Sequence, residues 1–201
     1  MQRNFGSRRS KIDPLEQYVS RSAYKLESVA DRLKLDFRDK TVLDVGSSTG
    51  GFSDFALKHG AKKVIAVEKG TKQMNQTLKL NPKLELHEKT DILDWKPTEH
   101  IDLVLIDVSF ISLKKILPAI GQWAGKDTLI TAMAKPQFEV IDSSLMNSGV
   151  IKNEHLRRAV LASLEQWFKQ NLVVIAKADS SVYGVKGNRE RFYLLAPVKN
   201  K

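Results

Sequence analysis

Short runs of apolar residues recur along the chain, and each is bounded by polar or turn-forming residues. Five of these runs predict strands: TVLDVG at 41–46, KVIAVE at 63–68, LELHEK at 84–89, DLVLID at 102–107 and TLITAMAK at 128–135. The segments between them are long enough for a helix, and such alternation is typical of βαβ units. The pattern therefore predicts a mainly parallel sheet.

Two segments have the apolar spacing of amphipathic helices. Leu26, Val29, Ala30 and Leu33 follow a possible N-cap at Ser20 or Ser22, and a second helix is predicted over 155–170. The near-continuous apolar strands indicate a sheet that is covered by helices on both faces. We therefore expect a doubly wound α/β fold.

The end of the chain has a different pattern. LVVIAKADSSV and RFYLLAPV flank the turn-rich GVKGNRE, which predicts a terminal hairpin and an antiparallel last strand. The stretch 140–149, VIDSSLMNSG, shows neither the apolar spacing of a helix nor the alternation of a strand, and it is rich in Ser, Asn and Gly. We expect it to be a mobile loop over a site.

Composition narrows the class of protein. The chain has 201 residues and a net charge of +10, so we expect one core and an anionic partner, although a basic enzyme without such a partner is the alternative. It has no cysteine, and its four histidines are too scattered for a metal site. No apolar stretch approaches the roughly 20 residues that span a bilayer, so a cytoplasmic location is expected.

The first 17 residues carry four cations and few apolar side chains. We interpret residues 1–17 as a flexible basic N-terminal arm that contacts phosphate, or equally as a terminus without a role, and residues 18–201 as one domain.

A glycine-containing segment follows the first predicted strand. Its spacing is G-x-x-x-G-G, which differs from the motif of dinucleotide binders and lacks the Gly-Lys-Ser/Thr of triphosphate binders. An adenosyl ligand without phosphate therefore fits better. The candidate cofactor-binding residues of this segment are Asp44, Gly46, Ser47, Ser48, Gly50, Gly51 and Phe52.

Two acids follow the next strands at the same sheet edge. Glu68 is placed to accept hydrogen bonds from ribose hydroxyls, as acids at this position do in such folds. Asp91 is expected to accept a hydrogen bond from an adenine amine or from a loop amide. Taken alone, Glu68 is more often an ordinary solvated acid.

Charged residues end the fourth and fifth strands and precede the last one. If the last strand lies beside the fifth, then Asp107, Lys135 and Glu190 meet at one rim, and Lys25 is a candidate fourth member. The pKa of a lysine falls when it is buried beside another cation, which suits a general base. An ion-pair network that only stabilises the rim is the alternative.

Five segments together resemble the TlyA, or hemolysin A, family of FtsJ-like ribosomal RNA methyltransferases. They are YVSRSAYKLE, LDVGSSTGGFSD, IDLVLIDVSFISL, AKPQFE and GNRE, in order from about residue 18 to 196. The resemblance implies a class I, Rossmann-like fold with a seven-stranded sheet. It also implies transfer of a methyl group from S-adenosylmethionine to a ribose 2′-hydroxyl of ribosomal RNA, of a cytidine in this family, and hence ribosomal RNA or a ribosomal subunit as partner.

By motif, the resemblance identifies Lys25, Asp107, Lys135 and Glu190 as the catalytic tetrad, with Lys135 as the base. It gives Gly46, Gly50, Glu68 and Asp91 to the cofactor, and we add Asp107 to that group. The candidate phosphate contacts are Arg3, Arg8, Arg9, Lys11, Arg21, Lys186, Arg189 and Arg191.

The chain departs from the family pattern at two places. Relatives carry a small RNA-binding domain ahead of the Ser-Arg segment, where about 17 residues stand here, and SSLMNSGVI replaces a loop that contains Gly and Lys. We expect RNA affinity, site choice and the substrate loop to differ accordingly.

Two other functions stay open, a non-catalytic RNA-binding relative and a membrane-active hemolysin. The intact tetrad argues against the first, and the apolar face of 155–170, which packing on the sheet explains, argues against the second.

Overall fold

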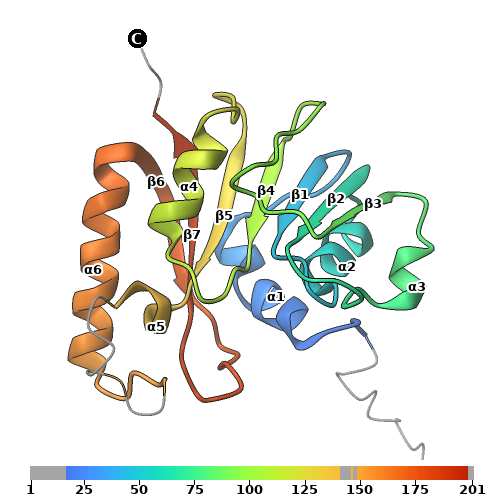
Figure 1. Cartoon of the computed structure of the whole chain (residues 1–201). Helices are drawn as coiled ribbons and strands as arrows, with labels where there is room; N and C mark the ends of the chain where they lie inside the picture. Colours follow the sequence, from blue (N-terminus) through green and yellow to red (C-terminus); the bar gives the residue numbers. More distant parts are fainter. Residues whose placement is uncertain (1–16, 141–145, 147–148, 199–201) are drawn as a thin grey trace, which may run out of the picture.

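The computed structural model describes residues 17–140, 146 and 149–198, which fold around one seven-stranded sheet. The order of the strands is β3-β2-β1-β4-β5-β7-β6 (Figure 1). Their bounds are β1 Thr41–Val45, β2 Lys63–Glu68, β3 Leu84–Glu88, β4 Leu103–Ile106, β5 Leu129–Ala134, β6 Leu172–Asp179 and β7 Arg191–Pro197. The first five strands are parallel, and β7 is antiparallel to both β5 and β6. The predicted sheet and terminal hairpin are therefore confirmed.

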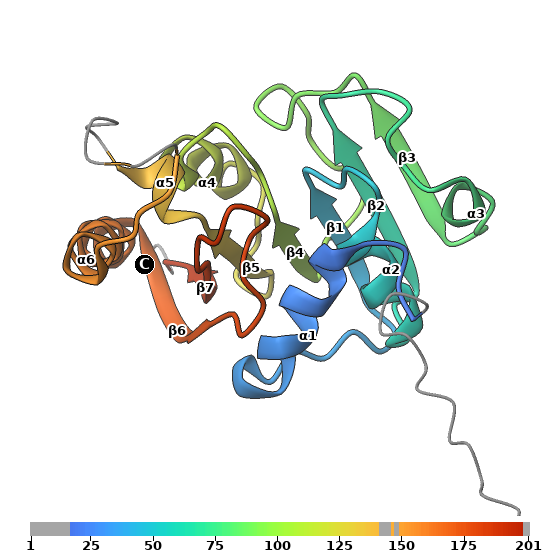
Figure 2. The same ribbon diagram turned by 90° about the horizontal axis from the view of Figure 1, so that it is seen from below.

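Helices cover the sheet on both faces (Figure 2). They are α1 Arg21–Leu33, α2 Gly51–Lys58, α3 Gln76–Lys79, α4 Leu113–Gly121, α5 Pro136–Glu139 and α6 Glu154–Asn171. One core joins the strands to α1 and α2 through residues such as Leu26 and Phe55. The other core joins them to α4 and α6 through residues such as Ile116 and Phe168. This is the predicted doubly wound arrangement.

The local sequence explains where the main helices begin. Ser20 caps α1, since its hydroxyl accepts a hydrogen bond from the amide of Ser22, and this decides between the two serines considered above. Asn153 caps α6 in the same way, through the amides of His155 and Leu156. The parallel strands β1 and β4 are buried along their whole length, which is why β4 is a continuous apolar run and β1 is apolar except at Thr41 and Asp44.

Some sequence predictions fall on residues outside the described part. They include the basic residues of the N-terminal arm and most of the proposed loop at 140–149. Among the helices that are described, none is both long and apolar enough to cross a membrane.

Candidate functional site

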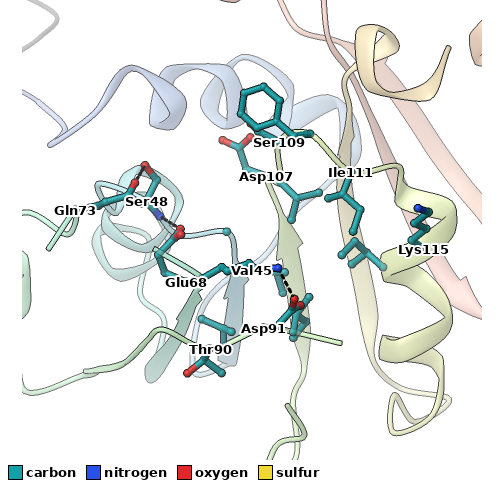
Figure 3. A pocket seen from close by; sticks show the side chains of 17 residues that line it. Val45, Ser48, Glu68, Gln73, Thr90, Asp91, Asp107, Ser109, Ile111 and Lys115 are labelled. Carbon is teal, nitrogen blue, oxygen red and sulfur yellow. Dashed lines mark hydrogen bonds and ion pairs between the residues drawn. The ribbon is translucent and has the colours of Figure 1, made fainter. Parts of the chain in front are cut away.

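A cavity of about 700 Å³ lies where the parallel strands end, between the segments that follow β1, β2, β3 and β4 (Figure 3). Its volume is in the range of small-molecule binding sites. Ser48 and Glu68 lie on one side and Ser109 and Ile111 on the other, with Asp107 between them (Figure 3). The carboxyl edge of such a sheet is where α/β proteins bind ligands.

Gly46 lets the segment after β1 approach β4. It has φ +78°, and a Cβ atom there would lie 2.8 Å from the backbone oxygen of Asp107. No side chain fits between the two segments, so the backbone itself forms this wall of the cavity.

Gly50 and Gly51 have a different role, because the space beside them is filled by protein. A Cβ atom at Gly50 would lie 2.4 Å from the Leu78 side chain, and one at Gly51 would lie 2.0 Å from the Ser22 hydroxyl. Both glycines therefore permit close packing of α2 against neighbouring helices. Neither lines the cavity.

Glu68 orders the loops at the rim. Its Oε2 atom accepts a hydrogen bond from the amide of Ser48 at 2.9 Å, and its Oε1 atom accepts one from the amide of Gly70 at 2.6 Å. Each carboxylate oxygen has a further lone pair, so Glu68 can still accept hydrogen bonds from a ligand. Gln73 also accepts a hydrogen bond from the Ser48 hydroxyl.

Three candidates from the glycine segment are buried behind the cavity and do not line it: Asp44, Ser47 and Phe52. Asp44 is 1% exposed and accepts a 2.6 Å hydrogen bond from the hydroxyl of Ser53. Burial raises the pKa of Asp44 to about 7, against the lowering effect of that hydrogen bond. Phe52 packs against Phe192 in the core.

Asp91 forms the loop contact that was one of its two expected roles. Its carboxylate accepts hydrogen bonds from the amide of Leu93 at 3.0 Å and from the Lys69 ammonium at 2.8 Å. Apolar side chains of Val67, Ile92 and Val108 complete the cavity wall. An apolar slot with carboxylates at its rim fits an adenosyl group, whose base is flat and whose ribose carries hydroxyl donors.

Two ion pairs stand beside the cavity. The Lys135 ammonium lies 2.6 Å from Asp107 Oδ1 and donates a 2.8 Å hydrogen bond to the Ser109 hydroxyl. The Lys25 ammonium lies 3.2 Å from Glu190 Oε1. Glu190 is only 2% exposed, and no described residue donates a hydrogen bond to its Oε2 atom. The carboxylate of Asp107 also lines the cavity, so it links the two parts of the site.

The sheet brings these two pairs to one rim. Ala134 at the end of β5 is paired with Arg191 at the start of β7, so Lys135 and Glu190 each directly adjoin the last pair of this ladder. Strand β4, which ends just before Asp107, lies beside β5. Figure 2 shows the loop between β6 and β7 next to α1, which supplies Lys25.

Sequence reasoning missed two exposed residues at the mouth of the cavity, Ser109 and Phe110. Phe110 is 89% exposed, has φ +65°, and lies 5.0 Å from the ring of Phe138. A bulky residue rarely adopts a positive φ, and such strain gathers at functional sites. An aromatic residue directly after a strand-ending Asp-x-Ser was the available signal.

The candidate phosphate contacts differ in their availability. Arg21, Lys186 and Arg189 are exposed near the tetrad, although the Arg189 guanidinium also lies 3.8 Å from Asp179. Arg3, Arg8, Arg9 and Lys11 lie outside the described residues. Arg191 is bound to Asp179 and Glu165 within the β6–β7 edge. Because its side chain is engaged by these acids, we do not include Arg191 among the phosphate contacts proposed below.

Known proteins that are similar to this chain include RNA methyltransferases. The family model described as FtsJ-like methyltransferase matches residues 18–196. The 23S rRNA (cytidine-2′-O)-methyltransferase TlyA of Campylobacter jejuni is 36% identical over 91% of this chain and 73% of its own length. The 16S/23S rRNA (cytidine-2′-O)-methyltransferase TlyA of Mycobacterium tuberculosis is 34% identical over 91% of this chain and 70% of its own length.

A solved structure has the same fold over nearly the whole chain. It is a protein from Streptococcus thermophilus that has been described as a hemolysin, and it superposes with a TM-score of 0.86 at 32% identity. The superposition covers 92% of this chain and 68% of the other.

Proposed function

The chain belongs to the FtsJ-like methyltransferase family, and from this premise we propose that it transfers a methyl group from S-adenosylmethionine to a ribose 2′-hydroxyl of ribosomal RNA, in a cytidine. The observation that carries the proposal is the pair of lysine–carboxylate contacts at the edge of a ligand-sized cavity. We assign Lys25, Asp107, Lys135 and Glu190 as the residues of the transfer site.

The residues at the cavity suit the cofactor. Glu68 would accept hydrogen bonds from the ribose of the cofactor, and Asp91 lies at the rim where the adenine base would bind. Because Gly46 has no side chain, the cofactor could contact the backbone there directly. When bound, S-adenosylmethionine supplies a methyl group that its sulfonium already activates. The protein therefore has mainly to align the attacking oxygen with that group.

The tetrad would prepare the hydroxyl. Lys135 contacts Asp107 and Ser109, which line the cavity. As the neutral amine it would take the proton of the ribose 2′-hydroxyl and become an ammonium, which Asp107 and Ser109 hold in place. Glu190 fixes Lys25, whose ammonium would bind and orient the ribose.

The surface around the tetrad suits an unpaired stretch of RNA. Phe110 offers an exposed ring on which a base can stack. Arg21, Arg189 and Lys186 are exposed cations near the loop that precedes Glu190, and they would contact phosphates. The basic N-terminal arm of residues 1–17 would extend this contact.

The test is methyl transfer by Lys135→Ala. We expect the variant to lose at least about 100-fold in turnover while its affinity for S-adenosylmethionine, measured by calorimetry, stays within about threefold, because a base acts after binding. The readout is transfer of labelled methyl to ribosomal RNA or to ribosomal subunits.

Lys126→Ala is the matched control, because Lys126 is an exposed lysine in the turn before β5, at the opposite end of that strand. It should transfer methyl groups at the parent rate. Turnover by Lys135→Ala equal to that of Lys126→Ala would remove Lys135 from the mechanism.

A further inference from the structure

Glu139 joins the two chain segments that carry Asp107 and Lys135. It ends α5, four residues after Lys135, and its side chain reaches the start of α4. Its Oε2 atom accepts a 2.5 Å hydrogen bond from the hydroxyl of Ser112, and its Oε1 atom accepts a 2.8 Å hydrogen bond from the amide of Leu113. Ser112 stands five residues after Asp107 and is itself the N-cap of α4.

The surroundings of Glu139 make this contact difficult to replace. Burial raises the pKa of the Glu139 carboxyl, while the hydrogen bonds from Leu113 and Ser112 act in the opposite direction. Leu113 is 1% exposed, so its amide has no access to solvent water as an alternative partner. A free amide at the first turn of a buried helix is costly, and a carboxylate is its best acceptor.

A second contact links the same two segments. The rings of Phe110 and Phe138 lie 5.0 Å apart, one on the segment after β4 and the other on α5. Pro136 is buried and opens α5 with a fixed φ. Residues 107–112 and 135–139 therefore form one connected unit, with Glu139 at the end opposite the tetrad.

The ion pair at the other end of this unit depends on the spacing of the two segments. The Lys135 ammonium contacts both Asp107 and Ser109, at 2.6 and 2.8 Å, and all three side chains project from these segments. A shift of about 1 Å at a reacting group can cost roughly 100-fold in rate.

We propose that Glu139 is a positioning residue: by tying Ser112 and Leu113 to α5, it fixes the distance between the segments of Asp107 and Lys135 and so holds the lysine in line for proton removal. Glu139 is not among the residues that line the cavity, and its side-chain hydrogen bonds go to Ser112 and Leu113 rather than to the tetrad. The inference rests on the proposed function for the role of Lys135, while the contact itself is independent of that function.

The experiment compares Glu139→Ala with Glu139→Gln. We expect Glu139→Ala to lower kcat about tenfold or more, with the Kd for S-adenosylmethionine and the KM for RNA within about threefold of the parent values. Glu139→Gln should recover most of the rate, because its amide oxygen can still accept from Leu113 and its amide nitrogen can donate to the Ser112 hydroxyl, which turns to accept.

Asp102→Ala is the matched control for a purely structural effect. Asp102 also links two segments through a carboxylate, since its Oδ2 atom accepts a 2.8 Å hydrogen bond from the amide of Thr41, but at the opposite end of the sheet. Asp102→Ala should lower Tm without lowering kcat. A parent-like kcat for Glu139→Ala, no recovery in Glu139→Gln, or an equal kcat loss in Asp102→Ala would each overturn the proposal.

A readout without turnover separates this inference from the proposed function. Fluorophenylalanine placed at Phe110 reports the position of the segment after β4 through its 19F resonance. We expect that resonance to shift or broaden in Glu139→Ala and to stay in place in Asp102→Ala, even if the parent transfers no methyl group to RNA. An unchanged resonance in Glu139→Ala would overturn the positioning role, whereas an inactive parent alone would overturn only the proposed function.

Discussion

The carboxylate of Glu190 has little room to move. It is almost fully buried, it faces the Lys25 ammonium, and a Cβ atom at Gly184 would lie 2.7 Å from its Oε1 atom. Burying a charge is costly unless it is paired, so the ion pair must be held at close range. Gly184 provides that space from within the same loop.

Gly184→Ala therefore tests whether activity depends on the observed position of the Glu190 carboxylate. The added methyl group should displace the end of the Glu190 side chain and lower kcat about tenfold. The Kd for S-adenosylmethionine should stay within about threefold, because Gly184 does not line the cavity. Calorimetry and the methyl-transfer assay measure the two quantities.

The control is Gly121→Ala, because a Cβ atom at Gly121 would meet nothing within 4 Å. It should keep both activity and stability. If Gly184→Ala also keeps the parent kcat, Glu190 does not need its observed position for catalysis.

At the residue scale, the sequence predicted the charged residues at strand ends but not the polar residues that hold them in position. Asp107, Lys135 and Glu190 are visible because each adjoins an apolar strand, and parallel strands end at one edge. Ser109 and Glu139 are ordinary polar residues in the sequence, and their roles depend on contacts across 26 or 27 residues. Gly50 and Gly51 followed a ligand-binding spacing, yet packing against Leu78 and Ser22 requires them.

At the scale of elements, the central strands could be predicted from the sequence because they are buried on both faces and are therefore mostly apolar. Strands β1 and β4 are buried throughout, and their predicted bounds agree with the structure to within one residue at each end. Helices α3 and α5 have four residues each, too few to show a period in the sequence. They depend on a cap at Asn75 and on Pro136 instead.

The edge formed by β6, β7 and α6 is held by an ionic network around Asp179. Its carboxylate accepts hydrogen bonds from Arg157 at 2.8 Å and from Arg191 at 2.6 Å. Burial raises the pKa of Asp179, but these hydrogen bonds outweigh it and lower that pKa to about 2. Arg157 also donates to the backbone oxygen of Arg189, next to Glu190, so the network supports the loop of the transfer site.

Asp179→Asn should lower the free energy of unfolding at pH 7 by about 2 kcal/mol or more, because the buried Arg157 guanidinium loses its carboxylate partner. Since the folded pKa is depressed, the stabilisation by Asp179 is complete above the unfolded pKa near 4 and is lost as the pH falls through about 2. The stability difference between parent and variant should shrink over that window in denaturant titrations.

Asp36→Asn serves as the comparison, because Asp36 is paired with Arg38 on the open surface. It should leave stability nearly unchanged at pH 7. A difference between parent and Asp179→Asn that stays constant from pH 5 to pH 2 would contradict the role given to the network.

At the scale of the whole molecule, sheet order creates both halves of the site. The cavity lies at the ends of the neighbouring strands β1 and β4, where the chain continues from β1 to α2 on one face of the sheet and from β4 to α4 on the other. The antiparallel β7 places Glu190 beside the end of β5. The alternation of strands and the terminal hairpin predicted a mainly parallel sheet with an antiparallel last strand, whereas the place of that strand beside β5 was a condition of the site prediction. The family match over residues 18–196 agrees with this fold. The register that pairs Ala134 with Arg191, and so brings Lys135 and Glu190 to one rim, required coordinates, because spacing alone does not fix strand pairing.

The position of the transferred methyl group tests the central claim most directly. Ribosomal RNA that has been incubated with the protein and methyl-labelled S-adenosylmethionine is hydrolysed with alkali, which cleaves only after riboses with a free 2′-hydroxyl. If the tetrad acts on that hydroxyl, the label will be recovered in alkali-resistant dinucleotides, and Lys135→Ala will yield none. Label recovered in mononucleotides, as methylation of a base would give, would contradict the account.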